Sequence, residues 1–127
     1  MEFNGDFVLV GVALRKDLVG AFLREAREQY GGNTSELVEA IKQDRNPEPK
    51  GKILGYDIHG DGIAESHSFL CHGLETDLNK EFSVNLNPHG LIDDGGGALR
   101  FSDWIMEKDL GEHCLWLPWR LDRYELS

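Results

Sequence analysis

The chain has 127 residues and carries 23 aspartates and glutamates against 13 lysines and arginines, which gives a formal net charge of −10. An apolar content of 40% with 28% charged residues is typical of a globular protein, and the length predicts one domain spanning residues 1–127. A strong negative field repels phosphates, so it argues against nucleic acid and membrane surfaces as partners. No apolar run approaches the roughly 18 residues that a membrane span requires.

The first residues lack the basic leader of a secretory signal, and the cysteines are Cys71 and Cys114. Two cysteines can form at most one disulfide bond. We therefore expect a cytoplasmic protein with two free thiols.

The N-terminal half predicts two strands and two helices. The unbroken apolar run at residues 7–14 predicts a strand buried on both faces, in the centre of a sheet. Residues 16–30 repeat apolar side chains at helical spacing, and a second helix is expected over residues 34–44. After a proline-containing loop, residues 53–58 predict a strand that ends in a turn at residues 59–62.

The C-terminal half predicts two further helices and a final strand. Leucine or phenylalanine recurs every fourth residue from 70 to 82, which predicts a helix over residues 66–82, with Gly73 at a close packing contact. Residues 83–94 are expected to be irregular or to form a short strand, with a turn at residues 87–90. Residues 93–97 predict a loop that leads into a last helix over residues 98–108. Residues 114–124 alternate as a strand, in which Pro118 predicts an edge position or a bulge. The whole pattern predicts an α+β fold, with a small sheet of three to four strands packed by about four helices.

The negative charge is concentrated in the second part of the chain. Residues 1–50 carry a net −2 and residues 51–127 a net −8. We expect these carboxylates to form a surface that attracts a basic protein and accelerates its association. The residues expected to contact that partner are Asp61, Glu65, Asp93, Asp94, Glu107, Asp109, Glu112 and Trp116. Trp116 and Trp119 should face opposite sides of a regular strand, so either one is exposed as an aromatic anchor or a bulge at Pro118 buries both.

Cysteine and histidine residues offer an alternative chemistry. His67 and Cys71 would share one face of the predicted helix, and together with His113 and Cys114 they could bind zinc or supply a nucleophilic thiol. Their spacing is not that of a zinc module, and Cys71, which lies next to the Leu70/Leu74 stripe, fits a small buried side chain better than a ligand. Residues 57–62 resemble the start of a calcium loop, but His59 and Ser68 occupy positions that require oxygen-rich ligands. We therefore expect no cofactor.

Three segments, residues 68–75, 87–92 and 114–119, resemble stretches in small uncharacterised bacterial cytoplasmic proteins, a resemblance that implies no activity. In size and acidity the chain also resembles bacterial toxin-immunity proteins. The sequence thus predicts a non-enzymatic acidic binding protein, in its most concrete form an immunity or inhibitor protein that blocks a basic toxin. The alternatives are a metal-binding or Cys/His-dependent enzyme and a structural subunit of a homo-oligomer.

Overall fold

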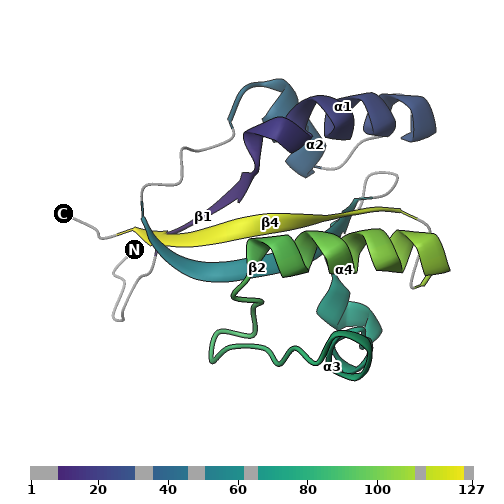
Figure 1. Cartoon of the computed structure of the whole chain (residues 1–127). Coiled ribbons are helices and arrows are strands. Elements are labelled where there is room, and N and C mark those ends of the chain that lie inside the picture. Colours follow the sequence, from purple (N-terminus) through teal and green to yellow (C-terminus); the bar gives the residue numbers. More distant parts are fainter. Residues whose placement is uncertain (1–8, 31–35, 46–50, 62–65, 111–113, 125–127) are drawn as a thin grey trace.

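The fold consists of one antiparallel sheet between two layers of helices. The computed structural model describes residues 9–30, 36–45, 51–61, 66–110 and 114–124. The strands are β1 (Leu9–Leu14), β2 (Lys52–Asp61), β3 (Ser66–Ser68) and β4 (Leu115–Tyr124), in the spatial order β1-β4-β2-β3. Helices α1 (Lys16–Tyr30) and α2 (Glu36–Lys42) cover one face, while α3 (Glu75–Phe82) and α4 (Gly95–Lys108) cover the other (Figure 1). The predicted α+β class, with its small sheet and four helices, is confirmed. None of the helices in these ranges is both long enough and apolar enough to cross a membrane.

The central strand β4 supplies side chains to both hydrophobic cores. Trp116 packs with α3 and α4, whereas Leu117 and Trp119 pack with α1 and α2. This alternation follows from the two-residue period of a strand. Both indoles are only 1% exposed because helices cover each face of the sheet, so neither tryptophan is available as a surface anchor.

Pro118 lies within this central strand, and the predicted edge position or bulge is wrong. The only irregularity in the pairing of β4 with β2 lies between Ile53 and Gly55, far from the proline. The main-chain N–H and C=O groups of Tyr56 bond to Ile92 and so point away from β4. Since these groups alternate in direction along an antiparallel strand, Asp57 and its partner Trp119 form a hydrogen-bonded pair of β2 and β4. The nitrogen of the preceding residue, Pro118, therefore points to the other side of β4, toward β1. The β1 ladder ends at the pair Leu14–Trp119, one residue short of the proline. The missing N–H therefore interrupts no hydrogen bond of the ladder.

Strand β1 occupies an edge of the sheet, contrary to the prediction of a central strand buried on both faces. Val10 and Val12 are 38% and 39% exposed, and only Ala13 and Leu14 are buried. An apolar run shows that a strand can be buried, but the pairing order decides whether neighbours cover it.

The predicted helix over residues 66–82 is three separate elements: β3, the 3-10 helix η1 (Phe69–His72) and α3. Gly73 ends η1 with a φ of 67°, the left-handed conformation that favours glycine. No atom lies within 4 Å of a Cβ built at this position, so the conformation explains the glycine and a close packing contact does not. Since His67 lies in β3 and Cys71 in η1, the two residues do not share a helix face.

Strand β2 continues through Asp61, so residues 59–61 are extended, and the predicted turn at 59–62 is wrong for these residues. The calcium-like segment at residues 57–61 is part of the same strand, and Gly62 lies outside the described residues. Near its other end, the segment before α4 docks on β2 through a main-chain bridge between Tyr56 and Ile92, with N···O distances of 2.7 and 2.9 Å. Gly55 permits this approach. A Cβ at Gly55 would lie 2.9 Å from the Ile92 carbonyl oxygen, and its φ of 141° also favours glycine.

Substitution Gly55→Ala should therefore lower the free energy of unfolding by about 2 kcal/mol, because the new methyl group meets backbone and the residue must adopt a strained φ. The matched control is Gly96→Ala in the first turn of α4, where a Cβ meets nothing closer than 3.6 Å. This control should be neutral or stabilising by up to about 1 kcal/mol. Urea denaturation of the two variants measures both effects, and equal stabilities would contradict the assigned role of Gly55.

Candidate functional site

The helical layer on one side of the sheet is strongly acidic. Residues 66–110, which contain α3 and α4, carry eight acidic and three basic residues, a net charge of −5. We call this part of the molecule the acidic layer. Six of its carboxylates have exposed side chains: Glu81, Asp93, Asp94, Asp103, Glu107 and Asp109.

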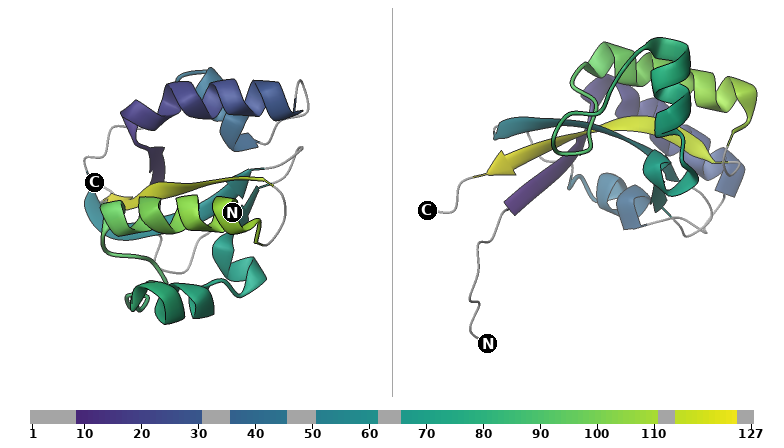
Figure 2. Two further views of the ribbon diagram at one scale, coloured as in Figure 1. Left: turned by 45° about the vertical axis from the view of Figure 1, so that its right-hand side comes forward. Right: turned by 90° about the horizontal axis from the view of Figure 1, so that it is seen from below.

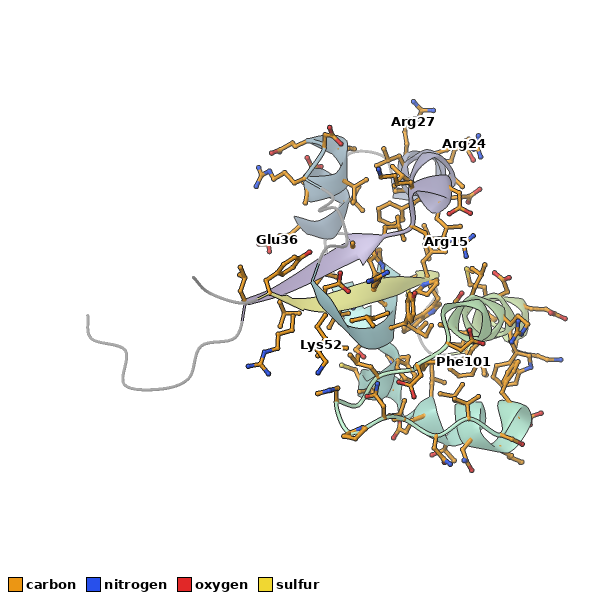
Figure 3. The ribbon with its side chains drawn as sticks, turned by 60° about the vertical axis from the view of Figure 1, so that its left-hand side comes forward. Arg15, Arg24, Arg27, Glu36, Lys52 and Phe101 are labelled. Carbon is orange, nitrogen blue, oxygen red and sulfur yellow. The ribbon has the colours of Figure 1, made fainter. Side chains whose placement is uncertain are left out.

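The helical layer on the opposite face is electrically balanced. Residues 15–45, which contain α1 and α2, carry six acidic and six basic residues. Arg24 and Arg27 point outward from α1, across the sheet from α4 (Figure 3), and Arg15 pairs with Asp17 at the surface. Views from two further directions show the two pairs of helices on opposite sides of the sheet (Figure 2). The two helical layers thus differ in net charge, and the carboxylates of residues 66–110 belong to the layer on the α3 and α4 side of the sheet.

An aromatic cluster lies beneath the outer surface of the acidic layer. Trp104 stacks on Phe101 with ring centroids 5.7 Å apart and meets Phe82 edge-on at 5.8 Å. Trp104 remains partly exposed on the helix that carries the exposed Asp103 and Glu107, whereas Trp116 is buried. The partly exposed tryptophan of this surface is therefore Trp104, which packs against the edge of the hydrophobic core under α3 and α4.

A cleft of about 180 Å³ opens where α4 begins. Phe82, Val84 and Ile92 provide its apolar lining, and Asp93, Asp94 and Arg100 contribute charged groups. The cleft brings together the end of α3, the segment that follows it and the first turns of α4.

The loop beside the cleft is fixed by the side chain of Asn87. Its Nδ2 donates to the carbonyl oxygen of Leu54 and to Oδ1 of Asp93, both at 2.8 Å. Its Oδ1 accepts from the main-chain N–H groups of His89 and Leu91 at 2.9 and 3.1 Å. This side chain therefore ties the predicted turn at residues 87–90 to β2 and orients the Asp93 carboxylate.

Asp94 is the N-cap of α4, which begins at Gly95 rather than at Ala98. Its carboxylate accepts hydrogen bonds from the N–H groups of Gly96 and Gly97 at 3.2 and 3.1 Å. It also lies 3.7 Å from the Arg100 guanidinium, and both side chains are largely exposed. The glycine segment is thus part of the helix, and the N–H groups of its first turn donate to the Asp94 carboxylate.

The residues expected to contact a partner fall into three groups. Asp93, Asp94, Glu107 and Asp109 are exposed on the acidic layer. Asp61 and Trp116 are each 1% exposed, so the structure removes them from the surface. Glu65 and Glu112 lie outside the described residues. Counting carboxylates along the sequence could not distinguish exposed from buried ones, because the burial of Asp61 depends on the position of its strand beneath α1 and α2.

The cysteine and histidine residues do not form a metal site within the part of the chain that the structure describes. No group of three or more His, Cys, Asp or Glu side chains there could hold a metal ion. Neither cysteine forms a disulfide bond; Cys114 is buried, whereas Cys71 is exposed, contrary to the expectation of a small buried side chain. His67 instead packs edge-on against His72 with ring centroids 5.8 Å apart, and His113 lies outside the described residues.

A serine, an aspartate and a histidine meet between β2 and β3, but not in the order of a catalytic triad. The Ser68 hydroxyl donates to Oδ1 of Asp57 at 2.7 Å, and Nδ1 of His59 lies 3.3 Å from Oδ2 of the same carboxylate. In a triad the imidazole lies between the hydroxyl and the carboxylate, so that it can remove the hydroxyl proton. Here the carboxylate lies between them, and the arrangement fixes β3 to β2 instead of activating Ser68.

Comparison with protein-family models, curated proteins and solved structures finds no match to this chain. The resemblances noted from sequence therefore bring no family assignment, and the acidic layer and its cleft must be interpreted from their own chemistry.

The capping role of Asp94 gives a direct test of how the cleft is built. Asp94→Ala should lower the free energy of unfolding by about 1 kcal/mol because two N–H groups lose their acceptor. Asp94→Asn should retain most of that stability, since asparagine caps helices about as well. Chemical denaturation compares the two variants, and equal losses would show that charge, not the cap, determines the effect.

The environment of Asp103 should make the free energy of unfolding depend on pH. Partial desolvation raises the pKa of its carboxyl above the ordinary value. The folded state therefore binds this proton more tightly than the unfolded state, and the resulting stabilisation is lost as pH rises from the unfolded pKa through the folded one. Asp103→Asn should raise the melting temperature at pH 7 relative to the parent protein. The difference should shrink or disappear at pH 3, and an unchanged difference across this range would contradict the assignment.

Proposed function

We propose that this chain is a non-enzymatic binding protein that presents its acidic layer to a basic protein. The observation that carries the proposal is the segregation of charge, with a net −5 on residues 66–110 and zero on residues 15–45. A uniformly charged protein would remain soluble without such segregation. A one-sided field, in contrast, orients an approaching cationic surface and increases the rate of encounter.

The surface combines the two kinds of group that protein interfaces use. Exposed carboxylates such as Asp103 and Glu107 supply long-range attraction, and the partly exposed Trp104 supplies an aromatic contact of the type enriched at binding hot spots. The α4 backbone holds these three side chains on a rigid element. Little conformational entropy is therefore lost when a partner binds.

In its most concrete form, the proposal is a cytoplasmic immunity or inhibitor protein. Its carboxylates would cover a basic substrate site on a toxin, in the place of an anionic substrate. The size and acidity of the chain support this version, as does the arrangement of the Ser68, Asp57 and His59 side chains, which does not suit nucleophilic catalysis. A gene for a large toxin next to the gene for this chain would add support.

The test compares charge removal on the two faces. A basic protein is captured from native lysate at low salt, purified, and measured against the double variant Asp103→Asn/Glu107→Gln on α4. The control is Glu28→Gln/Glu36→Gln, which removes the same charge from exposed positions on α1 and α2. The association rate should fall at least about threefold for the α4 variant and much less for the control.

Salt and specificity complete the test. The association rate should fall steeply between about 50 and 500 mM salt, because ions screen exposed charges. An unrelated basic protein such as cytochrome c should bind more weakly than the captured one. Binding that is independent of salt, or equally weakened by both double variants, would overturn the proposal. Sedimentation of the chain alone tests the homo-oligomer alternative, which stays a prediction.

A further inference from the structure

We propose that the cleft at the start of α4 receives a single lysine side chain of the basic partner. This inference rests on the proposed function, since it identifies the chemical group that the acidic layer recognises. The volume of the cleft, about 180 Å³, is below the range of roughly 300–1,000 Å³ that is usual for small-molecule pockets. The space therefore suits one long side chain better than a nucleotide or another organic cofactor.

The lining of the cleft matches the two parts of a lysine. Ile92 is buried and Phe82 and Val84 are half-buried, so these three side chains form an apolar surface for the methylene stem. The exposed carboxylates of Asp93 and Asp94 lie in the same cleft, and that of Asp93 can receive the ammonium group. Lysine is amphipathic in this way: its stem packs on apolar surface while its charge stays near polar groups.

The charges in the cleft favour one cation. Asp93, Asp94 and Arg100 sum to −1, so a single ammonium group neutralises them. Both oxygens of Asp94 cap α4, and Arg100 lies beside that carboxylate. The carboxylate left for a ligand is therefore that of Asp93. A phosphate would be repelled, because two carboxylates outweigh the one guanidinium group in the cleft.

The geometry of Asp93 favours lysine over arginine. Asn87 donates to Oδ1 of Asp93 at 2.8 Å, which engages one of its two oxygens and fixes the carboxylate. Arginine binds carboxylates best through two parallel hydrogen bonds, whereas lysine acts as a point charge that one oxygen can receive. The hydrogen bond from Asn87 therefore disfavours the two parallel hydrogen bonds that an arginine would form with Asp93. It still leaves the second carboxylate oxygen for the single contact of a lysine ammonium group.

The experiment is a nuclear magnetic resonance titration at low ionic strength with N-acetyl-lysine methylamide. Shifts should concentrate on residues 82–100 and follow a millimolar dissociation constant. The same compound with an acetylated ε-amine, and its norleucine analogue, should bind at least about tenfold more weakly, because each lacks the positive charge. The corresponding arginine compound should bind more weakly than lysine.

Two variants locate the binding. Asp93→Asn keeps an acceptor for Asn87 but removes the charge, and should weaken lysine binding about tenfold, whereas Glu28→Gln on α1 should change it less than twofold. Val84→Phe fills the cleft without changing any charge and should abolish the shifts, with the rest of the spectrum showing that the protein is folded. Shifts spread over all exposed carboxylates, or equal binding by the norleucine compound, would overturn the inference.

The outcome is separable from that of the proposed function. If the basic protein binds with the salt dependence described above but Asp93→Asn and Val84→Phe leave it unchanged, the acidic layer functions without the cleft and this inference is wrong. If the lysine compound binds in the cleft but no basic protein binds, the proposed function fails instead.

Discussion

Burial of both faces of β4 is the constraint on which the rest of the molecule depends. Trp116 on one face and Trp119 on the other are each 1% exposed, and each is a centre of a different hydrophobic core. Full burial of a large apolar side chain stabilises a fold by about 2–3 kcal/mol, so the two indoles couple both helical layers to one strand. The acidic layer and the balanced layer are on opposite faces because a single alternating segment binds them both.

The sequence predicted the elements better than their arrangement. The helix over residues 16–30 and the strand at 114–124 agree closely with α1 and β4, since helical and alternating periods are local properties. Which strand lies at the centre depends on pairing between distant segments. For this reason the apolar run at Leu9–Leu14 indicated a central strand and Pro118 an edge, and the structure reverses both assignments.

The helix predicted over residues 66–82 failed for a different reason. Leucines at 70, 74 and 78 share helical spacing, yet Leu70 is 39% exposed in η1 while the other two are buried. The φ of 67° at Gly73 interrupts the run, and a glycine within an apolar period is ambiguous between a packing contact and a cap. The same mistake suggested that His67 and Cys71 share one face.

The candidate site was partly visible in the sequence. Asp93, Asp94, Glu107 and Asp109 are exposed on one layer, as contact with a partner requires, and their role in binding stays a prediction. Asp61 was misplaced because its strand carries it beneath α1 and α2. The cleft itself could not be predicted, since it requires Asn87, Gly55 and the bridge from Tyr56 to Ile92 to bring separate segments together.

The strand order also determines when the molecule can fold during synthesis. β1 and β2 do not pair with each other, and both pair with β4, which follows the other described strands along the chain. While the ribosome still holds residues 115–124, the earlier segments lack the partner that joins them, and their apolar surfaces stay open to chaperones or to misassociation. Closing contacts such as Leu9–Tyr124 span almost the whole described chain. Folding should therefore follow translation of β4 instead of proceeding stepwise with it.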